Sequence, residues 1–335
     1  MKNRDALYHI APHLNTSQQV INVGRLLFLV GLAFAHYTEL FKKYHKLSLV
    51  CLKELGFGVN KVTEERILLQ TTDLFEVFRR FEGRPLDPKP FIMHAVSSIV
   101  TSILFGRRFL TTGNGYRSIT STATEFVENL DQSIDMAPLL RFLPMYRKKI
   151  ANMVRCQEGI MKGLEEGIAL SKLPDAEPSF VRRFLEDQGP EYDHQDLLYI
   201  LRDMCLGGSD TIVSTTLWFI VELANHPDIQ ERMQREIDRV VPGVRYPSLD
   251  DKAQLPYTEA VILEVMRRHT VVPLSLPHAT LTDTTTSGYF VPGGSLVGSM
   301  FEYIEISFPS YWVCGNASWL VAVLGIGGRA KFCFV

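Results

Sequence analysis

The clearest pattern of apolar positions in the chain runs from Asp193 to Asn225. Apolar residues there fall on nearly every side of a helix, which predicts one long helix, buried all round, that crosses the domain. Its centre is a Leu-Gly-Gly-Ser-Asp-Thr motif from Leu206 to Thr211. Each glycine costs a helix interior about 1 kcal/mol relative to alanine, and an acid beside an alcohol competes for backbone hydrogen bonds. Such a disturbance inside a well-formed helix indicates where function should be sought.

Three interpretations of this centre compete. In the first, Gly207 and Gly208 let another helix pack closely and Asp210 bonds to a polar partner. In the second, the glycines belong to a phosphate-binding loop, which is disfavoured because no strand precedes them and no lysine follows at the required position. In the third, the helix bends over a flat cofactor, the glycines admit the ligand to the backbone, and Asp210 and Thr211 handle protons. The helix alone leaves the first and third open.

Other periodic segments predict a mainly α fold. Helices are expected near residues 40–46, 61–81, 91–105, 146–170, 180–187, 227–240 and 257–269. The pattern changes late in the chain, where Val271 to Leu274 and Gly288 to Gly294 are rich in β-branched residues, proline and glycine. These two segments predict short strands joined by turns. The expected fold class is therefore mainly α with a small β part.

Composition narrows the class of protein. The 335 residues are 46% hydrophobic and 21% charged, with a net charge of −2, so no nucleic-acid partner is expected. Five scattered cysteines without Cys-x-x-Cys spacing argue against a disulfide scaffold or a zinc site. The apolar runs Leu26–Ala35 and Trp319–Ile326 are too short to span a bilayer, so neither gives a clear anchor to a membrane surface.

The order of motifs resembles that of the cytochromes P450, the microsomal haem-thiolate monooxygenases, in their family-2-like group. The motifs are Gly-Gly-Ser-Asp-Thr, Asn-His-Pro-Asp, Pro256-Tyr257, the Glu-x-x-Arg pair of Glu264 and Arg267, Pro273 to His278, and Gly-Tyr-Phe-Val-Pro-Gly-Gly. The resemblance implies an incomplete P450 fold, altered at both ends. It divides the chain into a divergent segment 1–30, a partial P450 domain 31–297 and a divergent apolar tail 298–335.

The resemblance also assigns roles on the central helix and its neighbours. Asp210 and Thr211 match the catalytic pair that delivers protons to iron-bound oxygen. Gly207 and Gly208 match the groove where oxygen and substrate meet the helix against the haem. Glu264 and Arg267 match a structural ion pair; Ala260, Val261, Leu263 and Met266 around it predict that the pair is partly buried.

Further haem and substrate contacts are implied at the edges of this region. His278 matches a residue that contacts a haem propionate, while Phe41 and His45 stand where the family has a tryptophan and an arginine for the same group. Four residues, Val272, Pro273, Leu274 and Leu276, match a segment that lines the substrate site.

The iron ligand is the main departure from the family. Gly325 to Cys333 is similar to the family's cysteine loop, but Arg329 and Cys333 are four residues apart where the family has two, and no glycine follows. Cys333 is therefore only a candidate axial ligand, and the alternative is a coincidence in an apolar tail.

The function implied is a haem-dependent monooxygenase that inserts one oxygen atom from O2 into a small apolar substrate. It would take electrons from an NADPH-dependent reductase at the cytosolic face of the endoplasmic reticulum membrane. The alternative is a non-catalytic truncated variant without the cysteine loop, with weak haem binding or none, and possible in the cytosol. A third hypothesis is a helical interaction protein that keeps the motifs as relics. Without its cofactor the central helix would leave an apolar face in water, at about 25 cal/mol per Å², which predicts poor solubility.

Overall fold

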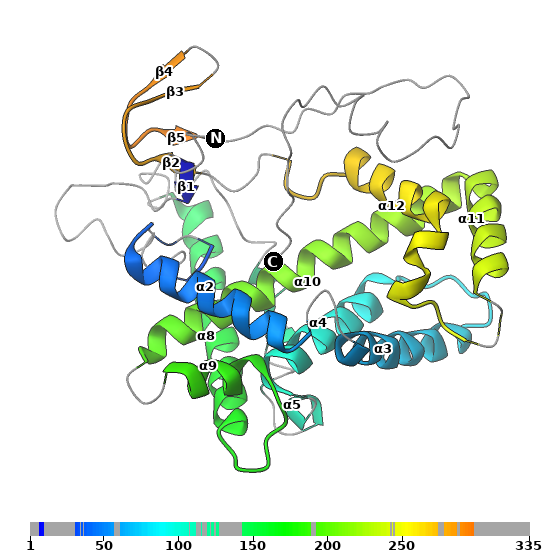
Figure 1. The fold of residues 1–335 in the computed structure, drawn as a ribbon, viewed down its shortest axis with the longest axis horizontal. Helices are drawn as coiled ribbons and strands as arrows, with labels where there is room; N and C mark the ends of the chain where they lie inside the picture. Colours follow the sequence, from blue (N-terminus) through cyan, green and yellow to red (C-terminus); the bar gives the residue numbers. More distant parts are fainter. Residues whose placement is uncertain are drawn as a thin grey trace. The chain divides into compact units, whose positions relative to one another are not determined.

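The computed structural model describes most of the chain between Gly31 and Val297. The described residues are 7–9, 31–33, 35, 37–56, 61–106, 108–111, 115, 119–120, 122–123, 125–126, 143–188, 192–241, 243, 245–273, 278–286 and 289–297. The chain divides into two compact units, Met1–Val213 with Leu274–Ser299, and Ser214–Pro273 with Met300–Val335. Among the described residues helices dominate and the few strands are short, most of them late in the chain, which confirms the predicted fold class (Figure 1).

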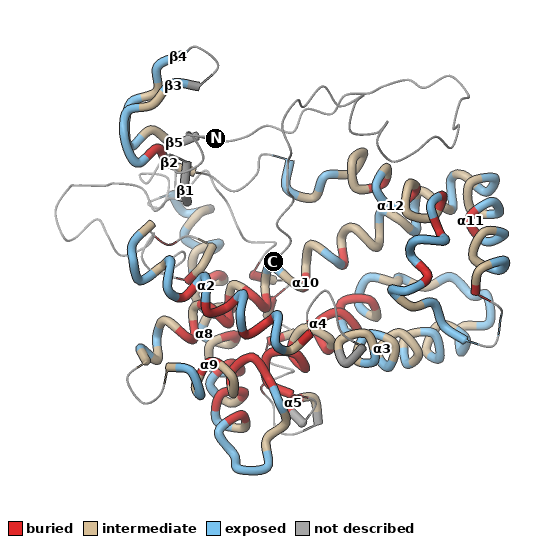
Figure 2. The backbone as a smooth tube through the Cα atoms, in the orientation of Figure 1, coloured by how far each residue is buried: buried red, intermediate tan, exposed pale blue. Residues whose placement is uncertain are grey.

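Helices build the first unit (Figure 1). They are α2 (Glu39–Glu54), α3 (Lys61–Arg79), α4 (Lys89–Phe105), α5 (Arg108–Thr111), α8 (Pro144–Ser171), α9 (Phe180–Gln188) and the first part of α10 (His194–Asn225). Figure 2 shows that buried segments gather on α2, α4, α8, α9 and that part of α10. Phe109, Phe180 and Phe184 are fully buried there. The predicted helices therefore exist. Their ends lie within a few residues of the expected positions except for α2, which continues to Glu54 beyond the expected 40–46.

Two glycines in this core have different roles: one ends a helix, and the other allows a close approach between helices. The helix α4 ends because Gly106 adopts φ 90°, a left-handed conformation that side chains rarely tolerate. A Cβ on Gly167 of α8 would lie 2.6 Å from the ring of Phe105, so only glycine lets α8 pack directly on the end of α4.

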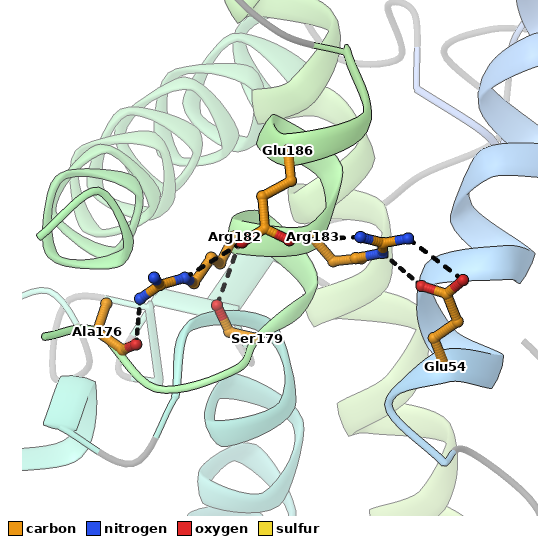
Figure 3. Close-up of polar contacts among 6 residues, drawn as sticks. All are labelled: Glu54, Ala176, Ser179, Arg182, Arg183 and Glu186. Atoms are coloured by element: carbon orange, nitrogen blue, oxygen red, sulfur yellow. Dashed lines mark hydrogen bonds and ion pairs between the residues drawn. The ribbon is translucent and has the colours of Figure 1, made fainter. Parts of the chain in front are cut away.

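Polar contacts fix α9 to its neighbours (Figure 3). Arg183 reaches across from α9 to the carboxylate of Glu54 at the end of α2 and also contacts Glu186. Arg182 donates to the carbonyl of Ala176, and its backbone N–H lies 3.3 Å from the Ser179 hydroxyl oxygen, which accepts. Of these contacts, the Arg183–Glu54 pair is the one that joins α9 to the C-terminal end of α2.

The described strands are short and antiparallel. One sheet has the order β1-β2-β5, formed by Leu7–His9, His278–Thr280 and Leu296–Val297. The other pairs β3 (Thr284–Thr286) with β4 (Tyr289–Val291). The strand predicted within Gly288 to Gly294 is thus confirmed as β4. The strand predicted at Val271 to Leu274 is wrong for its first three residues, which form a bend and a turn after α12, and Leu274 lies outside the described residues.

Three further helical segments build the described part of the second unit with the end of α10. They are α11 (Pro227–Val240), the 3₁₀ helix η3 (Leu249–Gln254) and α12 (Pro256–Arg268). Their small core contains Met233, Tyr257, Val261 and Val265, with Ile229 and Ile237 packed against it. The predicted apolar stripe on α11 therefore faces this core. Glu236 of α11 accepts hydrogen bonds from the backbone N–H groups of Tyr257 (3.0 Å) and Thr258 (2.7 Å), which fixes the start of α12.

The prediction that α10 is buried all round is wrong for its second half. Leu197 and Leu201 are fully buried, whereas Trp218 is 44% and Val221 45% exposed. The reason is the number of neighbours: several helices enclose the first half, while the described helices of the second unit cover one side of the rest. Among the described residues α10 is the one helix long and apolar enough to cross a membrane, a property that core helices share.

Candidate functional site

The glycine pair lies inside an unbroken α-helix. Helical hydrogen bonding continues from His194 to Asn225, and neither Gly207 nor Gly208 has a positive φ. A Cβ on Gly208 would sit 3.4 Å from a methyl group of Val100 on α4. A Cβ on Gly207 would meet no atom of the described residues within 4 Å. Each glycine therefore agrees with a different interpretation of the motif. Gly208 faces a packed helix, as in the first interpretation, and Gly207 faces open space, as the third requires.

Thr211 lies directly above Gly207 on the same face of the helix. Its hydroxyl donates to the Gly207 carbonyl at 2.6 Å, the i−4 contact that threonine makes when it turns back on its own helix. Asp210 beside it is half-buried, while Ser209 is buried. The structure thus brings Gly207 and Thr211 together at one open surface.

Asp203 is a positioning residue that sequence reasoning missed. One carboxylate oxygen accepts the backbone N–H groups of Leu32 (2.9 Å) and Ala33 (3.0 Å), and the other accepts two N–H groups of buried Arg202. A Cβ on Gly31 would lie 2.1 Å from this carboxylate, so glycine is required there. An Arg-Asp pair in an otherwise apolar stretch of helix was the available signal.

The proposed haem contacts on α2 lie on one face. Phe41 and His45 stack with their ring centroids 5.6 Å apart and planes 20° apart. Phe41 is half-buried and His45 is exposed. Thr38 caps the helix by accepting from the Phe41 N–H at 3.2 Å. The two rings therefore form one aromatic surface at the start of α2.

Glu264 and Arg267 form a two-pronged ion pair one turn apart on α12. The carboxylate oxygens lie 2.7 and 2.6 Å from the Arg267 Nε and Nη2 atoms. Their side chains are 16% and 21% exposed, so the pair is partly buried, as the apolar neighbours predicted. This geometry is the stronger kind of ion pair because the planar groups match.

The remaining predicted site residues are only partly described. Val272 and Pro273 are exposed, and His278 is half-buried in β2, paired with Val297 of β5. Leu274, Leu276 and Cys333 lie outside the described residues. For these residues the structure leaves the sequence assignments as predictions.

The described cysteines do not provide a thiolate. Burial raises the pKa of the Cys205 thiol to about 12 and that of Cys51 to about 11, so both stay protonated near neutrality. Cys156 is also buried. Within the described ranges, no group of three histidine, cysteine or acidic side chains is placed to hold a metal ion.

Comparison with known proteins identifies the fold. A solved structure titled "Zebra fish cytochrome P450 another structure with Progesterone" superposes with a TM-score of 0.70 over 83% of this chain and 66% of that one, at 23% identity. Cytochrome P450 2U1 of Mus musculus is 32% identical over 280 residues, which are 80% of this chain and 53% of the relative. Cytochrome P450 2K1 of Oncorhynchus mykiss is 32% identical over 80% of this chain and 55% of its own.

The chain spans about half the length of the curated relatives it matches. The family profile described as cytochrome P450 matches residues 30–305, which include α2 to α12 and the late strands. With the glycine pair of α10, the Glu264–Arg267 pair and the late strands in the family's order, these findings show that the chain belongs to the cytochrome P450 family.

Proposed function

We propose that the chain serves a haem-dependent monooxygenase that inserts one atom of O2 into a small apolar substrate. One observation carries the proposal: Gly207 leaves its side of α10 open, directly beneath the Thr211 hydroxyl. Family membership supports the same function. Haem, when bound, supplies oxygen activation at its iron.

The residues present fit a flat apolar cofactor along α10. The surface over Gly207 has no Cβ and no described atom within 4 Å of where one would be, so a planar group can approach the backbone. Gly207 and Gly208 would line that approach, and Phe41, His45 and His278 would contact the propionates. The axial ligand is not among the described cysteines, and Cys333 remains the candidate that the sequence offers.

Thr211 and Asp210 would manage protons at this surface. In the described geometry the Thr211 hydroxyl donates its proton to the Gly207 carbonyl, so this proton is held by the helix backbone. To donate toward the open side, the hydroxyl must turn and give up the 2.6 Å bond. The adjacent Asp210 side chain can supply the replacement proton when it is itself protonated, as a carboxylic acid.

We also propose the partners that this chemistry needs. An NADPH-dependent reductase supplies electrons, and Val272, Pro273, Leu274 and Leu276 contact the substrate. The cytosolic face of the endoplasmic reticulum membrane is the proposed location.

The test is the visible spectrum of the full chain purified after expression with haem precursor. We expect haem bound in a one-to-one ratio. After chemical reduction with dithionite and addition of carbon monoxide, we expect a Soret band at the position typical of thiolate ligation. Gly207→Val should reduce haem content at least about tenfold, because its branched side chain fills the open surface. Gly243→Val is the matched control, since a Cβ there also meets no described atom within 4 Å. No haem in the parent chain, or equal haem in both variants, would contradict the proposal.

A further inference from the structure

Glu222 is the centre of a charged cluster in the second unit. Its carboxylate lies 2.6 Å from the Nε2 atom of His269, 3.2 Å from the Nδ1 atom of His226 and 3.5 Å from the Nη1 atom of Arg268. The Glu222 side chain is 14% exposed and that of His269 is 16% exposed. One acidic group thus receives two imidazoles and a guanidinium at the end of α10.

The imidazole of His269 is held from two directions. Trp218, one turn before Glu222 on α10, stacks on it with centroids 4.0 Å apart and planes 6° apart. His269 is also the C-cap of α12, where its backbone N–H donates to the Val265 carbonyl at 2.9 Å. Its side chain therefore joins the end of α12 to the last turns of α10.

Protonation of this imidazole changes the strength of the junction. A carboxylate only accepts hydrogen bonds, so the Nε2 atom already carries a proton and a second proton adds at the Nδ1 atom. The resulting cation gains from the Glu222 charge and from the indole face. Arg268 and a protonated His226 oppose it, while the charge of nearby Glu264 is matched by Arg267. The Glu222 carboxylate lies 2.6 Å from the Nε2 atom of His269 and the Trp218 ring stacks on the imidazole, so the cation is stabilised at both of these direct contacts.

The Glu222 carboxylate stays ionised over the range in which imidazoles titrate. Burial raises its pKa, but the hydrogen bond from His269 and the charge of Arg268 outweigh burial and hold that pKa below its ordinary value. A cavity of about 100 Å³ lined by Glu222, His226, Glu264 and Arg268 has room for a few water molecules, which can bring protons to the cluster.

We propose that the Glu222–His269–Trp218 cluster is a proton-sensitive latch between α10 and α12. When His269 gains its second proton, the end of α12 is held more firmly on α10, and when the proton leaves, this end loosens. The latch controls the mobility of the chain that follows, from Thr270 to Pro273. It operates within the second unit and does not depend on a bound cofactor.

Trp218 provides a direct optical test. In the full chain with Trp312→Phe and Trp319→Phe, Trp218 is the one remaining tryptophan. A stacked imidazolium quenches indole emission, so we expect at least about a twofold fall as the pH drops from about 8 to about 5.5, the interval in which imidazoles ionise. His269→Gln keeps a side-chain donor for Glu222 but cannot ionise, and should abolish the step. His226→Gln is the matched control and should retain it.

A second measurement separates tightening from protonation alone. Hydrogen exchange at the His269 amide, corrected for its intrinsic pH dependence, should be about tenfold slower at pH 6 than at pH 8, because a charged hydrogen bond is stronger than a neutral one. A variant could also change its emission because it misfolds. Nuclear magnetic resonance of carbon-13 labelled histidine measures the ionisation directly in such a variant. An emission step that survives in His269→Gln, a flat parent profile, or exchange that ignores pH would each overturn the latch.

Discussion

The two halves of α10 are both rich in apolar residues but have different surroundings. Ile200 is 1% exposed, and Ile220, twenty residues later, is 39% exposed. The first half lies in a core made by several helices, and the second half shares a small core with α11 and α12. Apolar content therefore predicts that the segment is a helix, but it does not predict how far the helix is buried. Burial depends on how many elements pack around the helix.

The largest difference in stability between the two units is expected when an ion pair is broken in each. The Arg202–Asp203 pair in the first unit has side-chain exposures of 3% and 9%, against 21% and 16% for Arg267–Glu264 in the second. We expect Asp203→Asn to cost about 3–5 kcal/mol in the free energy of unfolding, because it leaves a buried guanidinium without its counter-charge and weakens the anchor of Leu32 and Ala33. Glu264→Gln should cost about 1–2 kcal/mol, between buried and surface pairs.

Chemical denaturation of the two variants measures this difference. Among the described residues, Arg202 is the one buried arginine with an unpaired nitrogen, because its Nη1 atom has no hydrogen-bond partner. Neutralising Asp203 would therefore weaken the charge interaction of a guanidinium that is already incompletely hydrogen-bonded. Equal losses in the two variants would show that burial does not distinguish the two units.

Truncation of one residue type at both ends of α10 gives the next effect. Ile200→Ala should destabilise the protein by about 2–5 kcal/mol, because it removes a buried side chain and leaves a cavity. Ile220→Ala should cost less than about 1 kcal/mol, since that side chain already keeps much of its water contact. Thermal unfolding followed by far-ultraviolet circular dichroism is the measurement. A larger loss at Ile220 would mean that the second half is covered in solution.

Sequence patterns predicted the helices well and the packing less well. The limits of α4, α8, α9, α11 and α12 followed from Pro, Gly and apolar spacing, which are local signals. The exposure of Trp218 and the bend at Val271 depend on contacts far along the chain, which no local signal carries. β1 was not predicted either, because three residues without clear alternation become a strand only by pairing with β2.

The candidate site shows the same division. The motif on α10 located Gly207, Gly208 and Thr211, but only the packing against Val100 distinguished the two glycines. The spacing of Glu264 and Arg267 predicted their pairing, since residues three apart share a helix face. For Asp203 the sequence offered one signal, a charged pair in an apolar stretch. Its partners could not be predicted, because Leu32 and Ala33 lie about 170 residues away and offer backbone groups.

Lowering the pH should affect the stability of the two units differently, because one carboxyl pKa is lowered in the second unit and another is raised in the first. In the second unit the pKa of Glu236 is held below its ordinary value, because the N–H groups at the start of α12 outweigh its burial. Its contribution to stability is therefore present above the unfolded carboxyl pKa of about 4.3 and is lost as the pH falls toward the lower folded value. In the first unit, burial and the charge of Asp193 raise the pKa of Asp196, so its contribution has the opposite sign.

Hydrogen exchange between pH 5 and pH 3 measures these trends unit by unit. We expect amides of α11 and α12 to lose protection before those of α8 and α9. Glu236→Gln should flatten the first trend, and Asp196→Asn should remove the opposing contribution. Uniform loss of protection in both units would contradict the assignment.

The smallest expected change in stability comes from replacing the two glycines of α10. Gly207→Ala should stabilise the folded chain by about 0.5–1 kcal/mol, because alanine restricts the unfolded chain and favours the helix at a position with free space. Gly208→Ala should gain less, since its Cβ would lie 3.4 Å from Val100. If Gly207→Ala stabilises the protein and also lowers its haem content, the glycine is retained for the open surface and not for folding. A gain in stability with unchanged haem content would instead mean that the cofactor does not approach α10 at this residue.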